Sequence, residues 1–267
     1  MLIAGQWSTL GRLSAPVHKL GKMFTYRGVL ELAEYWNHAA ANSFDLFSAD
    51  DEQKNAELRE EAPMIICFDL GGVLVRICRS WQEGCEAAHV PLRPFNETDE
   101  IRTQRSALIA SHQMGQLPPE DYFKSISELH ESIWSPHEIE RIHNAWILGP
   151  YPETAELIRD IHEAGHHTAC LSNTNESHWP SLLEDQAISQ LNYAHASHLM
   201  GLHKPDPQIW SAFEELIDCK STDIVFFDDL LENIQSALDA GWDAIQVDHE
   251  CSTVPQIREA LQKRKLI

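Results

Sequence analysis

Four short polar segments of this sequence carry the residue types that phosphoryl transfer by a carboxylate requires. They are Asp69-Leu70-Gly71-Gly72, Ser172-Asn173, Lys204-Pro205 and Asp228-Asp229. Each segment alone is more often a helix cap, a turn or a solvated charge. Together, in this order along the chain, they supply a nucleophile, a hydroxyl group, an ammonium group and a pair of acids. The set therefore predicts a site that handles a small phosphorylated molecule.

The nucleophile of this site is expected to be Asp69. Its carboxylate must stay ionised beside an incoming anion, so positive charge is needed next to it, and Lys204 can supply part of that charge. Ser172, Asn173 and Lys204 are expected to bind the phosphoryl oxygens as charge redistributes during transfer. The predicted catalytic residues are therefore Asp69, Ser172 and Lys204.

A bound Mg²⁺ ion is expected to supply the remaining positive charge. Mg²⁺ prefers oxygen ligands in an octahedron and keeps several of its waters. The candidate ligands are the Asp69 carboxylate, the Gly71 carbonyl and the Asp229 carboxylate. Magnesium is thus the predicted cofactor.

The four segments follow predicted strands or open predicted helices, which is where open parallel sheets place their active sites. The apolar run from Met64 to Phe68, closed by Asp69 and two glycines, is typical of a buried parallel strand. From residue 152 onward helices and strands alternate, which predicts an α/β fold with a doubly wound parallel sheet. The predicted strands are 64–68, 168–171, 193–196, 223–227 and 244–247, and the predicted helices are 153–164, 207–217, 232–240 and 253–263.

The stretch 81–146 shows only helical patterns separated by prolines, which predicts a helical bundle inserted into the sheet domain. We expect a core formed by 63–79 and 150–267 and a helical cap formed by 80–149. Residues 1–62 are predicted to be an N-terminal extension that is poorly ordered or partly helical, with a helix over 26–41 and a polar linker over 48–61.

The amino-acid composition and charge limit the kinds of binding partner that we expect. The net charge of -21 and the pI near 5.0 disfavour nucleic acid and anionic membranes as partners. The six cysteines form no CxxC pair, and no apolar run is long enough to span a membrane, so we expect a soluble cytoplasmic protein with free thiols. The expected partner is a small phosphorylated metabolite, and the protein is expected to be a monomer or homodimer.

The sequence segments FDLGGVLV, LSNTN, KPDPQIW and VFFDDLLENI resemble, in order, the four motifs of the haloacid dehalogenase superfamily across roughly residues 64–260. The helical block after the first motif resembles the cap of the first subclass. The amino-acid sequence around LSNTN, FFDD and Asn233 is most similar to that of α-D-glucose-1-phosphate phosphatases and of the N-terminal phosphatase domain of soluble epoxide hydrolase. The resemblance implies a Mg²⁺-dependent phosphatase with an aspartyl-phosphate intermediate, acting on a sugar phosphate, and it adds Asp228 and Asn233 as supporting residues of the metal site.

One position departs from the pattern of most phosphatases of this superfamily. They carry a second Asp two residues after the nucleophile as a general acid, and this chain has Gly71 there. General acid catalysis contributes about 10² to 10⁴ in rate, so its absence favours leaving groups that need little protonation. Sugar 1-phosphates, aryl phosphates and acyl phosphates meet that condition.

Substrate choice is expected to lie in the cap, which would close over the phosphate. The candidate cap residues are Arg76, Arg79, Trp81, Arg102, Arg105, His112 and Trp146. Among the fifteen histidines, those at 195, 198 and 203 lie nearest the predicted site in sequence and could tune phosphate binding. Two alternatives stay open: a metal-independent haloacid dehalogenase, disfavoured by Gly71 and the second acid at 229, and a catalytically weakened binding protein that keeps the fold.

Overall fold

The computed structural model describes residues 62–267. The helix and linker predicted within the first 61 residues lie outside the described part.

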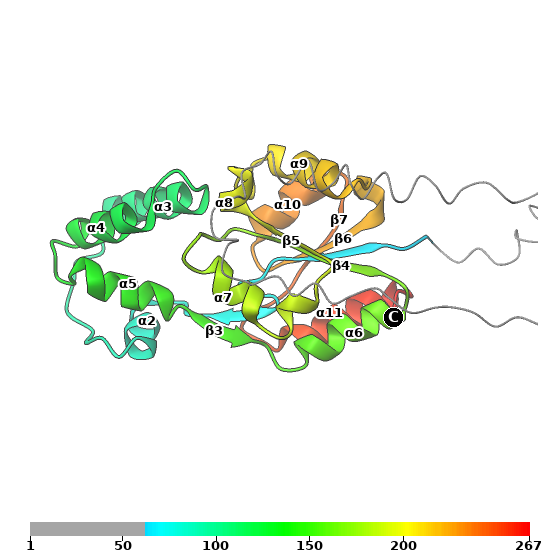
Figure 1. The fold of residues 1–267 in the computed structure, drawn as a ribbon, viewed down its shortest axis with the longest axis horizontal. Helices are drawn as coiled ribbons and strands as arrows, with labels where there is room; N and C mark the ends of the chain where they lie inside the picture. The colour runs from blue at the N-terminus through cyan, green and yellow to red at the C-terminus, as the bar shows by residue number, and fades with distance from the viewer. Residues whose placement is uncertain (1–61) are drawn as a thin grey trace, which may run out of the picture. The chain divides into compact units, whose positions relative to one another are not determined.

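A parallel sheet of five strands forms the centre of the core (Figure 1), in the order β5-β4-β1-β6-β7. The strands are β1 (Ile65–Phe68), β4 (His167–Ser172), β5 (Tyr193–Ala196), β6 (Ile224–Asp228) and β7 (Asp243–Gln246). The run of β1 is apolar along its whole length because both faces of this central strand are buried. The doubly wound α/β fold is confirmed.

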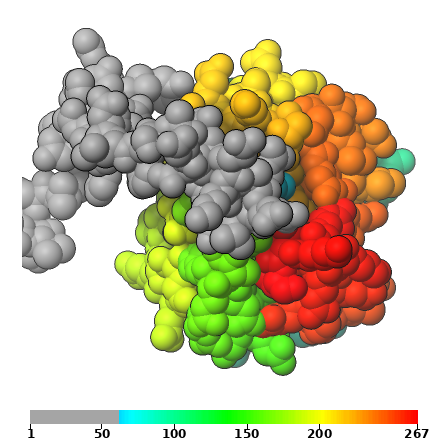
Figure 2. Space-filling view, turned by 90° about the vertical axis from the view of Figure 1, so that its right-hand side faces the viewer, coloured from blue at the N-terminus to red at the C-terminus, as the bar shows by residue number. Residues whose placement is uncertain are grey.

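Helices cover both faces of the sheet, and alternate side chains of β1 enter two separate apolar clusters. Ile66 and Phe68 pack with α6 and α11, whereas Ile65 and Cys67 pack with α9 and α10. These helices are α6 (Thr154–Glu163), α9 (Gln208–Ile217), α10 (Leu231–Asp239) and α11 (Thr253–Lys263), with the shorter α7 (Trp179–Glu184) and α8 (Ser197–Met200) between β4 and α9. Figures 1 and 2 show α11 beside α6 on one face.

Four helices between β1 and β4 form a separate layer with its own apolar cluster. They are α2 (Trp81–Ala87), α3 (Asp99–Gln113), α4 (Pro119–Leu129) and α5 (Pro136–Asn144). Their starts follow ordinary capping chemistry, since the Ser80, Thr98 and Ser135 side chains accept hydrogen bonds from the first turns of α2, α3 and α5. Ser135 and Glu138 complete a capping box.

A two-stranded antiparallel ribbon joins this helical layer to the core, and the sequence patterns did not predict it. It pairs β2 (Val75–Ile77) with β3 (Ile147–Pro150). The strands are three and four residues long and lie 69 residues apart (147 minus 78), so neither carries a periodic signal of its own. The ribbon brings the two ends of the helical block together beside the sheet.

Candidate active site

The topology brings three of the four predicted segments to one edge of the sheet. Ser172 ends β4, Asp69 directly follows β1, and Asp228 ends β6. These three strands are neighbours in the parallel sheet, so their carboxyl ends lie side by side. The backbone N–H of Asp69 donates to the Phe227 carbonyl at 2.8 Å, which fixes the first loop against the last.

Lys204 links this edge together from a loop between α8 and α9. Its Nζ lies 3.0 Å from Asp69 Oδ1 and 2.7 Å from Asp228 Oδ2, and the side chain is only 1% exposed. Burial opposes the ammonium charge, but the two carboxylates outweigh it and raise the pKa of Lys204 above its ordinary value. Lys204 is therefore a permanently charged, rigidly held cation beside Asp69.

The electrostatics of Asp69 and Asp228 differ although both contact Lys204. Burial raises the pKa of Asp69 to about 6, against the lowering effect of Lys204, and the two neighbouring acids add to the rise. Asp228 is satisfied by hydrogen bonds, since Oδ1 accepts from the Leu230 N–H at 2.8 Å and Asn233 Nδ2 donates to both oxygens at 3.0 Å. Asp228 and Asn233 thus hold the loop and Lys204. Asp69 is the less constrained carboxylate, because its Oδ1 accepts no well-aligned hydrogen bond from the described residues.

Asp229 points into the same site and is met by two basic side chains from other segments. Its Oδ2 lies 3.0 Å from Arg79 Nη2 and 3.1 Å from His249 Nδ1, with the carboxylate 3% exposed. Burial and Asp228 raise the pKa of Asp229, while Arg79 and His249 lower it. The pairing with Arg79 and His249 was not predicted, because both residues are distant in sequence from residue 229.

The residues present fit a divalent cation. Oxygen atoms of Asp69, Asp228 and Asp229 lie within 4.8 Å of one another, the one such group of potential metal ligands among the described residues. Asp69 Oδ1 and Asp229 Oδ2 are buried and accept no well-aligned hydrogen bond from the described residues, although cationic nitrogens stand nearby. Three carboxylates against two close side-chain cations, Lys204 and Arg79, leave negative charge for a hard cation to neutralise.

Asn173 lines the cavity, and its amide also holds the backbone of Lys204. Its predicted contact with substrate stays a prediction. Its Nδ2 donates to the Lys204 carbonyl at 2.8 Å, and its Oδ1 accepts from the Lys204 N–H at 2.9 Å. The amide therefore clamps the loop of Lys204 to the end of β4. Ser172 is 4% exposed and lines the cavity beside Gly71, and within the described residues its hydroxyl makes no hydrogen bond. Ser172 is positioned to bind a phosphoryl oxygen.

The two glycines after Asp69, Gly71 and Gly72, meet different structural requirements. Gly72 has φ +84°, and a Cβ there would lie 2.1 Å from Arg79 Nη2 and 2.6 Å from Asp229 Oδ2. Only glycine permits this turn and this close approach. At Gly71 a Cβ would meet the flexible end of Ile77 at 3.2 Å, and its φ lies outside the left-handed region. Space alone therefore does not exclude a side chain at residue 71.

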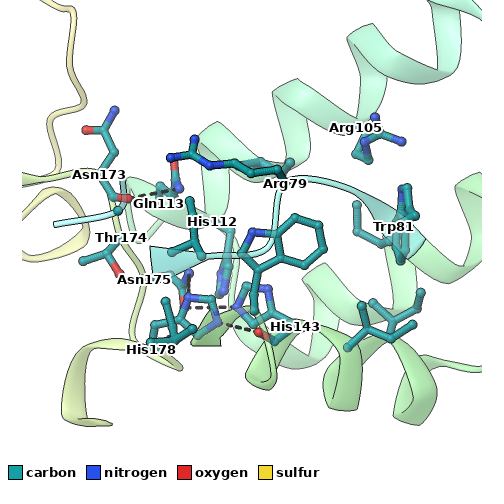
Figure 3. Close-up of a pocket in the computed structure, with 18 of the residues that line it drawn as sticks. Arg79, Trp81, Arg105, His112, Gln113, His143, Asn173, Thr174, Asn175 and His178 are labelled. Carbon is teal, nitrogen blue, oxygen red and sulfur yellow. Dashed lines mark hydrogen bonds between the residues drawn. The ribbon is translucent and has the colours of Figure 1, made fainter. Parts of the chain in front are cut away.

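A cavity of about 660 Å³ lies between the helical layer and the end of the sheet (Figure 3). It reaches Gly71 and Ser172 at the core end. Of the predicted cap residues, five line it: Arg79, Trp81, Arg105, His112 and Trp146. The other two do not, since Arg76 donates to the Leu148 carbonyl and Arg102 pairs with Asp99 on the exposed side of α3.

Histidines gather where the cavity meets the core, and the sequence patterns missed most of them. His143 and His178 stack with ring centroids 4.0 Å apart, and His178 Nε2 lies 2.7 Å from the His143 carbonyl. Burial lowers the pKa of both rings, so they are neutral at physiological pH. The histidines at 195 and 198 pack on aromatic rings instead, and that at 203 bonds to Gln113. No signal in the sequence separates the 143–178 pair from the other histidines.

The comparisons with known proteins agree with this geometry. Residues 63–241 match haloacid dehalogenase-like hydrolases, so the chain belongs to that family. Phosphatase MT3486 of Mycobacterium tuberculosis is 29% identical over 105 residues, covering 39% of this chain and 48% of the relative. Acyl-CoA dehydrogenase family member 10 of Mus musculus is 25% identical over 206 residues, covering 73% of this chain and 19% of the relative. The chain thus spans about half or less of the curated relatives it matches.

Solved structures share the fold. A haloacid dehalogenase family enzyme from Bacteroides thetaiotaomicron, in complex with magnesium and inorganic phosphate, has a TM-score of 0.59 at 21% identity, covering 70% of this chain and 95% of that chain. The L-2-haloacid dehalogenase of Xanthobacter autotrophicus has a TM-score of 0.52 at 15% identity, covering 69% and 77%. Both similarities concern the fold alone.

No helix within residues 62–267 combines the length and the apolar character that crossing a bilayer requires.

Proposed function

We propose that this chain is a Mg²⁺-dependent phosphatase that hydrolyses a small phosphomonoester through an aspartyl-phosphate intermediate. The observation that carries the proposal is the buried ion-pair network in which Lys204 joins Asp69 to Asp228, with Asp229 close enough to share a cation with them. The proposal assigns 80–149 as the cap and 63–79 with 150–267 as the catalytic core. The similarity to a mycobacterial phosphatase and to a family enzyme that binds magnesium and phosphate supports it.

The first step assigned to Asp69 is attack of a carboxylate oxygen on the phosphorus atom. The P–O bond to the leaving group breaks, and its electron pair stays on the departing oxygen. Lys204 neutralises a non-bridging phosphoryl oxygen, and the Ser172 hydroxyl donates to another. Water then attacks the phosphorus of the aspartyl phosphate, which releases inorganic phosphate and restores Asp69.

A divalent cation bound by Asp69, Asp229 and the Gly71 carbonyl would supply the positive charge that lets Asp69 meet an anionic ester. Asp228 would act beside it by holding Lys204 and the loop through Asn233. The Gly72 turn would keep Asp229 close to this set, because its missing Cβ leaves room for the carboxylate.

The substrate of this proposal is a small phosphorylated metabolite, with a sugar phosphate as the expectation carried from the resemblance. The cytoplasm is the proposed location, and a monomer or homodimer the proposed state. The cysteines support a reducing compartment, because all six are free thiols and four of them are buried.

The test is hydrolysis of p-nitrophenyl phosphate with added Mg²⁺, with EDTA, and with Asp69→Asn as the control. We expect Mg²⁺-dependent release of phosphate, loss of that release in EDTA, and acid-stable labelling of the wild-type protein from a ³²P-labelled ester. Release of chloride from 2-chloropropionate in EDTA, without phosphate release, would instead establish a dehalogenase. Binding of phosphate without turnover of any ester would establish a binding protein.

A further inference from the structure

The wall of the cavity that faces away from the sheet is apolar and aromatic. It is formed chiefly by Trp81, Phe95, Ile109, Ile126, Ile139 and Trp146, which come from all four cap helices and the segments joining them. Trp81 stacks on Trp134 with centroids 5.1 Å apart and meets the edge of Trp146 at 6.5 Å. A group bound against this wall is offered ring faces and branched aliphatic carbons.

Several polar groups along the cavity already have partners, whereas His112 Nε2 and Arg105 Nη1 make no well-aligned hydrogen bond with the described residues. Gln113 Nε2 donates to the Asn173 carbonyl at 3.2 Å, and His143 Nε2 lies 3.3 Å from Asn175 Oδ1. Arg105 pairs with Glu97. Figure 3 shows the polar loop of Asn173 to Asn175 on one side of the cavity and Trp81 with Arg105 on the opposite side. The apolar wall itself offers only the indole N–H groups of Trp81 and Trp146, so a polyhydroxylated body would bring more hydroxyl groups than this wall can satisfy.

This shortage of free partners discriminates between classes of leaving group. A hydroxyl buried without a hydrogen bond weakens binding by about tenfold or more. A sugar ring carries several such hydroxyls. An aromatic ring carries none, and gains from the indoles and isoleucines instead.

The cap histidine beside Gln113, His112, does not replace the acid missing at Gly71. It lines the cavity, and the neighbouring Gln113 side chain donates to the Asn173 carbonyl at the core end. His112 Nδ1 lies 2.8 Å from the Leu117 carbonyl, which places the proton of the neutral ring on Nδ1 and leaves a lone pair on Nε2. Burial lowers the pKa of His112, so the ring stays neutral and does not donate from Nε2. The departing oxygen must leave as a weak base.

We propose that the natural substrate class is the phosphate monoester of a phenol, in place of the sugar phosphate that the resemblance implies, with the aromatic body held in the cap cavity. This inference rests on the proposed function. Attack of Asp69 on phosphorus expels a phenolate, which keeps the electron pair of the broken P–O bond and takes its proton from water. Two observations with different origins lead to this class: the apolar cap wall and the glycine at 71.

The test compares four esters at saturating Mg²⁺ by kcat/KM: 1-naphthyl, phenyl and cyclohexyl phosphate, and glucose 1-phosphate. Phenyl and cyclohexyl phosphate have nearly the same shape but leaving groups of very different pKa. We expect phenyl phosphate to exceed cyclohexyl phosphate and glucose 1-phosphate by about 10² each. We expect 1-naphthyl phosphate to exceed phenyl phosphate by about tenfold, because its second ring fills more of the apolar cavity.

Adjacent residues of α3 offer a matched pair of variants. Ile109 lines the cavity, whereas Leu108 packs on the same apolar cluster without lining it, and both are half-buried. Ile109→Asn should lower kcat/KM for 1-naphthyl phosphate by about tenfold relative to kcat/KM for acetyl phosphate, which has almost no apolar body. Leu108→Asn should leave both values unchanged, and it controls for general damage to the cap.

The possible outcomes distinguish a failure of this inference from a failure of the proposed function on which it rests. Turnover of glucose 1-phosphate or cyclohexyl phosphate as fast as phenyl phosphate would overturn the assignment to phenols while Mg²⁺-dependent phosphatase activity stood. Equal effects of Ile109→Asn on naphthyl and acetyl phosphate would overturn the role of the cap wall. Failure of Mg²⁺ to promote hydrolysis of any ester, acetyl phosphate included, would remove the proposed function and this inference with it.

Discussion

The site at the ends of the strands and the cavity beside it are built from opposite kinds of chemistry. At the core end, Lys204 pairs with the Asp69 and Asp228 carboxylates, and the Asp229 carboxylate lies close to both, although burial alone would disfavour every one of these charges. At the cap end, indoles and isoleucines form the wall, and the histidines beside them are kept neutral. In the proposed function, the core end binds and attacks the phosphate group of any ester, whereas the cap end only selects among the groups attached to that phosphate.

The proposed function therefore assigns reactivity and selectivity to different parts of the chain. The charged residues sit at the ends of strands in a rigid sheet, where positions are set to a fraction of an ångström by the backbone ladder. The apolar wall sits on helices attached through one short ribbon. Variants at one end should therefore alter rate for all esters, and variants at the other should alter their ranking.

The largest expected effect comes from removing the nucleophile. Asp69→Asn should lower phosphate release from p-nitrophenyl phosphate by about 10⁴-fold or more, because Asn cannot form the aspartyl phosphate. The variant should still bind 1-naphthyl phosphate, since the cap wall is untouched. Steady-state kinetics and fluorescence titration measure the two quantities. Activity within tenfold of the wild type would show that the core end does not attack through residue 69.

Lys204 should matter for stability as well as for rate. Lys204→Met leaves the Asp69 and Asp228 carboxylates buried without their cation, so we expect a loss of about 3 to 5 kcal/mol in the free energy of unfolding. Adding Asp228→Asn removes one of the stranded charges and should recover part of that loss. Urea unfolding of both variants measures the difference. A double variant no more stable than the single one would contradict the assignment of the cost to unpaired charge.

A general acid introduced at residue 71 should reduce the difference in turnover between esters with good leaving groups and esters with poor ones. Gly71→Asp should raise turnover of cyclohexyl phosphate by up to about 10², with little change for phenyl phosphate, provided that the end of Ile77 shifts to admit the new Cβ. Gly71→Asn is the matched control, being of the same size without a proton to donate. Equal gains for both variants would mean that space, rather than acid catalysis, limits the wild type.

The smallest expected effect concerns the neutral histidines at the cap end. Burial holds the pKa of His143 well below its ordinary value of 6.5, and the neighbouring histidines, His178 and His112, reinforce this. The unfolded chain therefore binds a proton more readily, and stability present above about pH 6.5 is lost as the pH falls below that value. Between pH 7.5 and 5.5, His143→Gln should reduce the drop in Tm by about 2 °C.

The exposed histidine on the same helix provides the control for that measurement. His137 has a side chain 78% exposed, and His137→Gln should leave the drop in Tm as in the wild type. Taking differences between variants cancels the opposite contribution of Asp69, whose pKa is raised to about 6. Identical pH profiles for the two variants would mean that His143 is accessible to protons in the folded state.

Sequence patterns were sufficient for the α/β sheet, because its strands and helices are marked by local signals. The predicted strand 193–196 and helix 253–263 coincide with β5 and α11, and the other predicted core elements agree within one residue at each end. Each is a short apolar run or an amphipathic period closed by a glycine, a proline or a polar cap. The conjunction of Asp69, Ser172, Lys204 and Asp229 was visible for a related reason, since each lies at a strand end or in a loop.

Only the tertiary structure determined the contacts between residues that lie far apart in the chain. Neither the antiparallel ribbon that carries the cap nor the Asp229 contacts with Arg79 and His249 has a local signature. The clamp of Asn173 on the Lys204 backbone and the neutral state of His143 are likewise properties of the packed state. The amino-acid sequence determines which side chains exist and where strands end. Hydrogen-bond partners, desolvation and the shape of a cavity depend on which surfaces meet in space.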